Sequence, residues 1–379
     1  MIYFDNSATT YPKPQQVTEA VKKGVLLYGG NPGRSGHDIS IRVSDMVFAV
    51  RVKLGEMFGA LPERVVFTEN CTMSLNTAIG SIPACSDVIT TDLEHNAVIR
   101  PLEAARKQGR LRYRILPTGR DNCGLISRLS AMLRPDTKAV VMTAASNVTG
   151  RILPVREVGA FCKRHGIRLI VDAAQAAGVI PLNCKQDNID VLCMSGHKGL
   201  YGITGTGVLL AGENVNLKPL IYGGTGTESL SPVQPDMLPE ALESGTIPTV
   251  GICALDAGLS YLQTHGIEKL TRRNLELCRM LYEALSAMPQ ATIYSPKPEW
   301  GICVPIVAFS IAGEPSETTA AKLNEHGFAL RGGYQCAAVT HRKLHTMDTG
   351  VVRFSPSCFN TRQEVGQLIQ ALKQIVAKK

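Results

Sequence analysis

The sequence lacks several features that would assign a protein to a class at once. It has no run of eighteen apolar residues, so no segment has the length of a membrane-spanning helix. Its first residues lack the basic stretch and the long apolar stretch of a secretory signal, and we therefore expect a soluble, cytoplasmic protein that does not bind membranes. No internal repeat or low-complexity segment occurs.

Paired metal-binding cysteines are also missing. The chain has 11 cysteines, but no two are spaced as C-x-x-C, so neither a metal site nor a disulfide framework is predicted. Many lie within apolar segments, and we expect Cys162, Cys193, Cys253 and Cys303 to be buried in a protein of a reducing compartment.

Basic runs are absent too, although the net charge is +8. Because the lysines and arginines are scattered, nucleic acid is not expected as a partner, and an anionic cofactor, an anionic substrate or an acidic protein fits the charge better. With 44% hydrophobic and 19% charged residues the chain is globular. Its 379 residues exceed the usual size of one core, which predicts two domains.

Short apolar segments without polar alternation recur between about residues 60 and 210. Such strands are typical of a mostly parallel sheet with helices on both faces, which predicts a large α/β domain over 15–255. The predicted strands are Val65–Phe67, Ala139–Met142, Leu169–Val171, Val191–Met194 and Val208–Leu210.

The remaining segments, 1–14 and 256–379, predict a smaller α+β domain. It contains strands at Val304–Ile311 and Val351–Phe354 and a helix from Ser316 that stops at Gly327. A final helix is predicted by Thr361 and Glu364, which have the spacing of a capping box.

Lys198 is the strongest candidate for catalysis. It lies in the segment Ser195-Gly196-His197-Lys198, directly after an apolar strand. A lysine reacts as a nucleophile only when its pKa is lowered, and a dry pocket with neighbouring cations does this. The segment therefore indicates a Schiff-base lysine of a pyridoxal phosphate enzyme, with a solvated turn as the alternative.

Polar side chains also follow the other strands of the predicted sheet, where ligands of parallel sheets bind. Thr72 at a helix start could bind phosphate, but the same segment could only cap the helix. Asp172 could bind a protonated pyridine nitrogen or cap the next helix, and the residues alone do not separate these roles. His95 could cover the ring, although a lone histidine is more often structural.

Together these segments resemble the class V aminotransferase superfamily, specifically its cysteine desulfurase and selenocysteine lyase branch. The resemblance covers nearly the whole chain and is carried by the following segments: Tyr3 to Thr10, Glu94-His95-Asn96, Val171 to Gln175, Ser195 to Lys198 and Glu243-Ser244-Gly245-Thr246. It implies pyridoxal phosphate fold type I and a homodimer with shared active sites.

The resemblance also implies a role for each candidate residue. Lys198 would bind the cofactor covalently, Asp172 its ring nitrogen and Gln175 its ring hydroxyl, while His95 would stack on the ring. The phosphate would be bound by the remaining polar set, namely Cys71, Thr72, Ser195, His197 and Thr246 of the other subunit. Asn147 would lie beside cofactor and substrate, and Arg353, with Arg331 as the next candidate, would bind the substrate carboxylate.

Cys336 would decide the reaction. The segment Arg331 to Ala337 resembles the R-x-G-x-x-C-A motif of group II desulfurases, in which the cysteine takes sulfur from L-cysteine; the alternative is a free surface thiol. Two departures from the group are Tyr334-Gln335 in place of two histidines, which questions proton handling and partner choice, and Cys71 in place of a threonine, which removes one hydroxyl.

The expected function is therefore L-cysteine desulfuration. A persulfide would form on Cys336, L-alanine would be released, and the sulfur would pass to an acceptor protein. A selenocysteine lyase acting on L-selenocysteine shares every cofactor contact. Another lyase or aminotransferase of the superfamily is the further alternative, and there Cys336 would be incidental.

Overall fold

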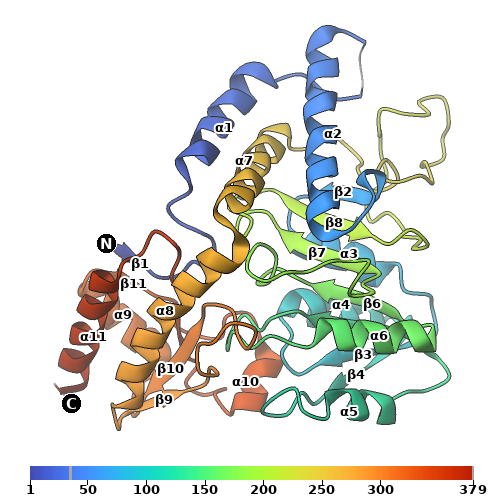
Figure 1. The fold of residues 1–379 in the computed structure, drawn as a ribbon. Helices are drawn as coiled ribbons and strands as arrows, with labels where there is room; N and C mark the ends of the chain where they lie inside the picture. Colours follow the sequence, from blue (N-terminus) through green and yellow to red (C-terminus); the bar gives the residue numbers. More distant parts are fainter. Residues whose placement is uncertain (34–35, 378–379) are drawn as a thin grey trace.

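The larger part of the molecule is built on a seven-stranded sheet (Figure 1). The structure is a computed structural model that describes residues 1–33 and 36–377. The strand order is β2-β8-β7-β6-β5-β3-β4, and only β8 runs against the other six. The strands are β2 (Val65–Thr68), β3 (Ser86–Thr91), β4 (Leu111–Leu116), β5 (Thr137–Thr143), β6 (Arg168–Asp172), β7 (Val191–Ser195) and β8 (Gly207–Ala211).

Helices cover both faces of this sheet, which confirms the predicted mostly parallel α/β architecture. Alternate strand residues pack on opposite sides: Val140 and Leu169 join one apolar core, whereas Val141 and Ile170 join another. The first core is shared with α2 (Asp38–Phe58), α5 (Leu125–Ala131), α6 (Val155–His165) and α7 (Thr249–His265), and the second with α3 (Cys71–Gly80) and α4 (Asn96–Lys107).

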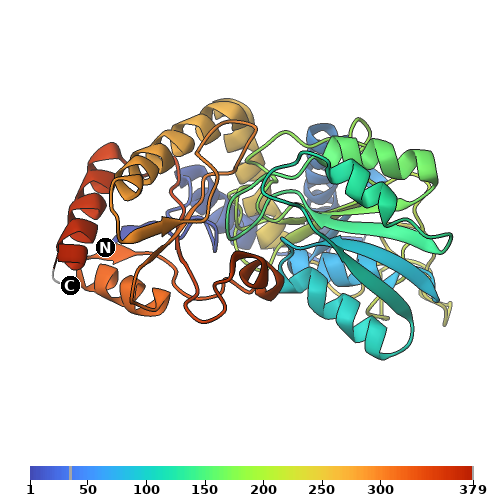
Figure 2. The same cartoon turned by 90° about the horizontal axis from the view of Figure 1, so that it is seen from below.

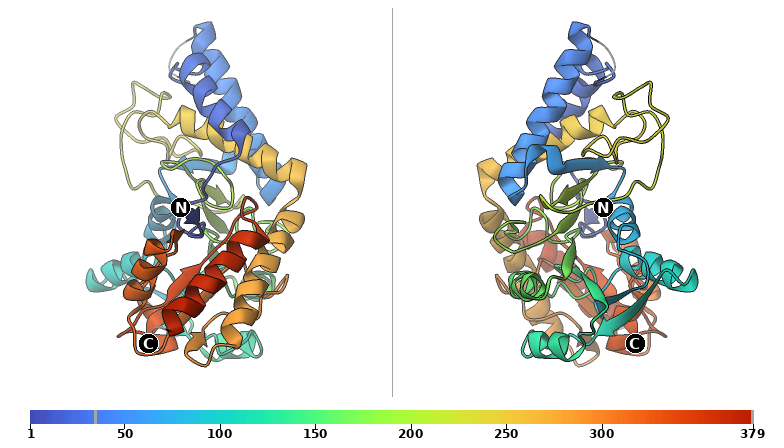
Figure 3. Two further views of the ribbon diagram at one scale, coloured as in Figure 1. Left: turned by 90° about the vertical axis from the view of Figure 1, so that its left-hand side faces the viewer. Right: turned by 90° about the vertical axis from the view of Figure 1, so that its right-hand side faces the viewer.

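The smaller part contains a three-stranded antiparallel sheet, β12-β10-β9, and a parallel pair, β1-β11. In Figure 3 the helices α8 and α11 lie side by side on its outer face. Its strands are β1 (Ile2–Tyr3), β9 (Ala291–Ile293), β10 (Val307–Ile311), β11 (Phe328–Ala329) and β12 (Val352–Phe354), and its helices are α8 (Ile267–Ser286), α9 (Ser316–Glu325), α10 (Ala338–Leu344) and α11 (Arg362–Ala377). Two further helices lie against the larger part: α1 (Gln15–Leu27) packs on α7, and a short 3₁₀ helix (Pro62–Arg64) packs on α2.

The capping box at α11 is confirmed, because the Thr361 amide donates to Glu364 Oε2 at 2.7 Å and the Glu364 amide donates to Thr361 Oγ1 at 3.2 Å.

The predicted start of β10 at Val304 is wrong: the strand begins at Val307. The Val304 amide instead donates to the carbonyl of Gly150 at 2.8 Å, and Pro305 has no amide hydrogen to offer a strand.

Both ends of the described chain lie in the smaller part (Figure 2). The N-terminal residues join it through β1, which pairs with β11, and through Phe4, which is buried in its core. The division into 15–255 and 1–14 with 256–379 stays a prediction, and α7 runs through position 255.

Candidate active site

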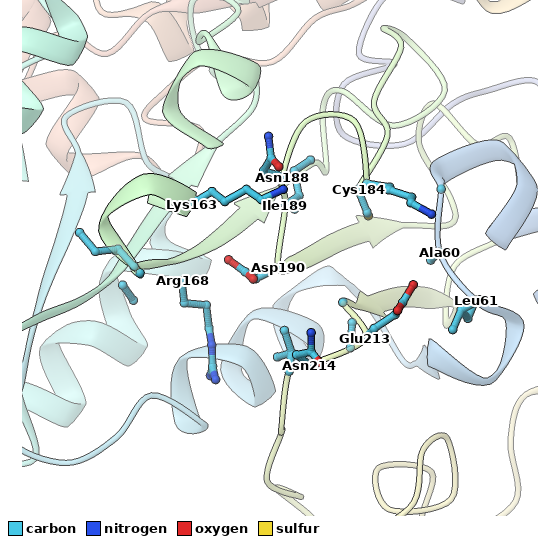
Figure 4. Close-up of a pocket in the computed structure, with 18 of the residues that line it drawn as sticks. Ala60, Leu61, Lys163, Arg168, Cys184, Asn188, Ile189, Asp190, Glu213 and Asn214 are labelled. Atoms are coloured by element: carbon cyan, nitrogen blue, oxygen red, sulfur yellow. The ribbon is translucent and has the colours of Figure 1, made fainter. Parts of the chain in front are cut away.

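One wide cavity of the described structure lies away from the place where the sequence predicts the chemistry. About 950 Å³ in volume, it lies where β6 and β7 begin, and Figure 4 shows Lys163, Arg168, Asp190 and Glu213 around it. Its described lining includes none of the predicted site residues.

A second cavity, of about 230 Å³, lies at the opposite edge, where β5, β6 and β7 end. Ligands of parallel sheets bind at this edge. The structure brings nine of the predicted residues together in its lining, namely Cys71, Thr72, His95, Asn147, Asp172, Gln175, Ser195, His197 and Lys198.

Lys198 is placed by the turn that follows β7. The Tyr201 amide donates to the Lys198 carbonyl at 2.9 Å, and the Gly202 amide donates to the Gly196 carbonyl at 2.8 Å. Burial lowers the pKa of Lys198, and the nearby carboxylate of Asp172 only partly offsets this. The amine is thereby made more available as a nucleophile and as a base.

Asp172 is the last residue of β6 and is buried. Its Oδ1 accepts a hydrogen bond from the Ala174 amide at 2.9 Å, and the carboxylate lines the cavity. The helix-capping alternative is wrong, because a turn and no helix follows β6 in the described chain. Cys71 Sγ donates to Asp172 Oδ1 at 3.5 Å. Burial raises the pKa of Cys71 well above its ordinary value, so the thiol keeps its proton for this bond.

His95 caps α4, since its Nδ1 accepts a hydrogen bond from the Ala97 amide at 3.0 Å. Nδ1 therefore carries no proton in the neutral ring, and Nε2 carries it. Burial lowers the pKa of His95 to about 4, despite the nearby Asp172, so the imidazole is neutral at pH 7. His95 thus has both a structural role and a position at the cavity.

The N-terminus of α3 also opens onto the cavity. Asn70 caps it, with Oδ1 accepting from the Met73 amide at 2.9 Å, so capping does not require the side chain of Thr72. His197 lines the same cavity; burial lowers its pKa to about 4, and Lys198 and Lys13 lower it further. His197 Nδ1 is buried without a hydrogen-bond partner in the described part of the chain.

Two amide side chains complete the lining. Gln175 Nε2 donates to the Ser7 carbonyl at 2.9 Å. Asn147 Nδ2 donates to the Gln335 carbonyl at 2.7 Å, whereas its Oδ1 is buried with no partner among residues 1–33 and 36–377. Asn147 therefore joins the cavity to the segment that precedes Cys336.

Arg353 is buried beside the cavity rather than in its lining. Its Nη1 donates to the Asn147 carbonyl at 3.0 Å and its Nη2 pairs with Asp5 Oδ1 at 2.7 Å. Its Nε has no partner in the described residues. The sequence did not predict the ion pair of Arg353 with Asp5, because the two residues lie 348 positions apart.

Cys336 is exposed and also lies outside the cavity lining. The Asn96 amide, next to His95, donates to the Cys336 carbonyl at 2.7 Å. Arg331 Nη2 lies 3.9 Å from the Cys336 sulfur. The thiol is therefore held next to the cavity and beside a cation, whereas Cys162, Cys193, Cys253 and Cys303 are buried as predicted.

Thr246 is not brought to the cavity of its own chain. Its hydroxyl oxygen accepts from Asn31 Nδ2 at 3.4 Å, on an exposed segment. Its segment is anchored by Glu243, which forms a buried ion pair with Arg51 of α2.

The family model for aminotransferase class V matches residues 2–368 of the chain. The protein belongs to the class V aminotransferase family.

Relatives and solved structures place this member of the class V aminotransferase family in one branch of it. It is 30% identical to a "Probable cysteine desulfurase" of Pyrococcus abyssi and 28% identical to one of Synechocystis, over 99% of this chain and 94% and 91% of theirs. The apo structure of a cysteine desulfurase from Thermococcus onnurineus matches with TM-score 0.93 and 29% identity, covering 100% of this chain and 95% of that one. A cysteine desulfurase from Escherichia coli, in an S-sulfonic acid form, gives 0.88 and 27%, covering 99% and 94%. The predicted fold type I and family branch are confirmed.

The sequence did not predict a cation, Lys13, that contacts the loop before Lys198. Lys13 Nζ donates to Thr10 Oγ1 at 2.6 Å and to the His197 carbonyl at 2.8 Å, and burial lowers its pKa to about 8. Lys13 reaches the active-site loop through a contact with a residue 184 positions away. The sequence around Lys13 has no motif that predicts this contact.

None of the described helices is long and apolar enough to cross a membrane. Within residues 1–33 and 36–377 no group of three or more metal-ligating side chains comes together.

Proposed function

We propose that this protein is a pyridoxal phosphate-dependent L-cysteine desulfurase of the cytoplasm. It forms a persulfide on Cys336, releases L-alanine and passes the sulfur to an acceptor protein. The observation that carries the proposal is the placement of Cys336, an exposed thiol whose carbonyl is hydrogen-bonded at the cavity that holds Lys198 and Asp172. The names of the relatives support the same activity.

The lining of the cavity fits pyridoxal phosphate. A carboxylate at one end suits a protonated pyridine nitrogen, and a buried lysine of lowered pKa suits the aldehyde. At the other end, the N-terminus of α3 and the unpartnered Nδ1 of His197 offer donors to a phosphate. We assign Lys198, Asp172, His95 and Gln175 to the ring, and Thr72, Ser195, His197 and the backbone amide of Cys71 to the phosphate end. The Cys71 thiol itself donates to Asp172.

When bound, this cofactor withdraws electrons from the substrate and weakens the bonds at its α- and β-carbons. Lys198, whose pKa is lowered by burial, would accept the α-proton of L-cysteine. Cys336 then attacks the substrate sulfur: the carbon–sulfur bond breaks, a sulfur–sulfur bond forms, and the carbon is reduced as the sulfur is oxidised. The products, L-alanine and a persulfide on Cys336, contain every atom of L-cysteine and the thiol.

Arg353 and Asn147 are our candidates for the substrate carboxylate. Arg353 Nε is a buried donor with no partner in the described chain. Asn147 Nδ2 uses one hydrogen for the Gln335 carbonyl and has a second to donate, whereas its unpartnered Oδ1 can only accept a hydrogen bond. A guanidinium binds a carboxylate with directional, charge-assisted hydrogen bonds. Arg331, beside the Cys336 sulfur, is the second cation within reach.

We further propose a homodimer in which Thr246 reaches the phosphate of the partner subunit. Its absence from the cavity of its own chain supports this. Helices α1 and α2 and the loop before α7 project at one end of the molecule (Figure 1), and they expose Leu26, Phe48, Tyr222 and Met237. A large exposed apolar surface of this kind is typical of an interface.

The test is to give the purified holoenzyme L-cysteine, L-selenocysteine and common amino acids, and to quantify L-alanine and the persulfide on Cys336. We expect one L-alanine for each sulfur transferred from L-cysteine, with the persulfide mapped to Cys336 by mass spectrometry. Turnover of L-selenocysteine alone would instead identify a selenocysteine lyase. Transamination without sulfur transfer would refute both.

A further inference from the structure

The segment that carries Cys336 has a strained backbone. Gln335 and Cys336 are consecutive residues with positive φ, 44° and 55°, and neither is glycine. The left-handed conformation is unfavourable for a residue with a side chain, because Cβ comes too close to the following carbonyl oxygen. Such strain persists only where surrounding contacts hold it, and it commonly marks a functional segment.

Two residues of the larger part hold this segment by the backbone carbonyls of Gln335 and Cys336. Asn147 Nδ2 donates to the Gln335 carbonyl at 2.7 Å, and the Asn96 amide donates to the Cys336 carbonyl at 2.7 Å. These two bonds leave the side chain of Gln335 to point away from the cavity, into the smaller part of the molecule.

A chain of side-chain hydrogen bonds holds Gln335 there. Its Nε2 donates to the Val351 carbonyl at 3.0 Å, so its Oε1 is the acceptor for His341 Nε2 at 3.2 Å. His341 must therefore carry its proton on Nε2, which leaves Nδ1 to accept from the Thr346 hydroxyl at 2.7 Å. Gln335, His341 and Thr346 are all buried.

Gln335 stands where group II desulfurases have a histidine, and its orientation shows that it does not handle protons in the reaction. An amide does not titrate, and this one is turned away from the substrate cavity, so it carries no protons in the reaction. Burial also lowers the pKa of His341, which keeps its ring neutral and its hydrogen bonds fixed near pH 7. Tyr334 packs edge-on against that ring, with the centroids 5.4 Å apart.

We propose that the chain Thr346–His341–Gln335 positions Cys336 for attack on the substrate sulfur. Residues of α10 and of the turn after it thereby fix the strained segment from the side away from the cavity. The inference rests on the proposed desulfurase function. None of the three side chains contacts the cavity lining, so we expect them to set the rate of sulfur transfer and not the affinity for cofactor or L-cysteine.

Thr346→Val tests the proposal, because it removes the hydroxyl that donates to His341 and keeps the shape. Thr340→Val is a matched control: Thr340 is also buried, on the same helix as His341, but its hydroxyl has no partner in the described residues. Thr346→Ser restores the hydroxyl. The measurements are the single-turnover rate of persulfide formation, the Michaelis constant for L-cysteine and the hydrogen exchange of amides 331–337.

We expect Thr346→Val to slow persulfide formation about tenfold, as expected for the loss of one buried hydrogen bond, with the Michaelis constant unchanged and faster exchange of amides 331–337. Thr346→Ser and Thr340→Val should match the wild type in all three. Equal rates for the two valine variants, or a change in the Michaelis constant alone, would overturn the positioning role. If the wild type itself forms no persulfide, the proposed function fails, whereas the exchange difference between the valine variants still decides whether the chain holds the segment.

Discussion

Removing Arg51 should destabilise the protein far more than removing a surface arginine. Arg51 donates to Glu243 through both terminal nitrogens, at 2.9 and 2.6 Å, and each side chain is only 8% exposed. Glu243 Oε1 also accepts the Phe67 amide at 2.6 Å, and Arg51 donates to the Val65 carbonyl. Burial raises the pKa of Glu243 in spite of Arg51, so the desolvation of this carboxylate is costly.

Arg51→Met leaves that carboxylate buried without its cation, and removal of one partner of a buried pair costs about 3–5 kcal/mol. In the double variant Arg51→Met, Glu243→Leu no charge is left buried. The Phe67 amide then loses its acceptor, at about 1–3 kcal/mol. We therefore expect the double variant to be more stable than Arg51→Met alone.

The assay is urea unfolding of the apoprotein at one fixed protomer concentration, followed by far-UV circular dichroism. Arg362→Met is the control, because its pair with Glu276 is exposed, and its unfolding midpoint should equal that of the wild type. The reasoning is refuted if Arg51→Met also leaves the midpoint unchanged, or if the double variant loses as much as the two single variants together.

Four further outcomes are expected. Cys336→Ser should bind L-cysteine but form no persulfide, and sulfide release at the wild-type rate would contradict its role. Arg353→Lys should raise the Michaelis constant for L-cysteine by at least about tenfold, since lysine cannot replace the directional bonds of a guanidinium; an unchanged constant would move the anchor elsewhere. Burial lowers the pKa of His95 from 6.5 to about 4, so between these pH values the unfolded state binds more protons than the folded state. The free energy of unfolding should therefore fall as the pH drops through this window. His95→Gln should reduce that pH dependence, and an unchanged dependence would reject the assignment. Mixing Lys198→Ala and Thr246→Ala subunits should restore tight cofactor binding at one site per dimer, and mass spectrometry showing exchanged subunits without recovery would exclude shared sites.

The fold and the cavity lining could be predicted because each depends on short-range pattern. Buried parallel strands are continuous apolar segments; Asp172 is the last residue of one of them and Lys198 lies three residues after another. Strand-end position together with the family resemblance therefore predicted nine residues that line one cavity at this edge of the sheet.

Contacts between distant segments could not be predicted in this way. The hydrogen bond from Cys71 to Asp172 depends on how α3 packs against β6, and the pair of Asp5 with Arg353 joins opposite ends of the chain. The start of β10 at Val307 depends on Gly150, which takes up the Val304 amide. Each is settled by tertiary geometry, for which the local sequence has no signal.

The N-terminal segment gives the folding of this chain a fixed order. β1 pairs with β11, Asp5 with Arg353, and Lys13 with the loop before Lys198. During translation, at 5–20 residues per second, Asp5 precedes Arg353 by roughly 17–70 seconds. The large sheet can form in that interval, whereas β1 stays an unpaired edge until the C-terminal third emerges. A ribosome-bound chain should thus acquire the seven-stranded sheet well before it acquires a complete active site.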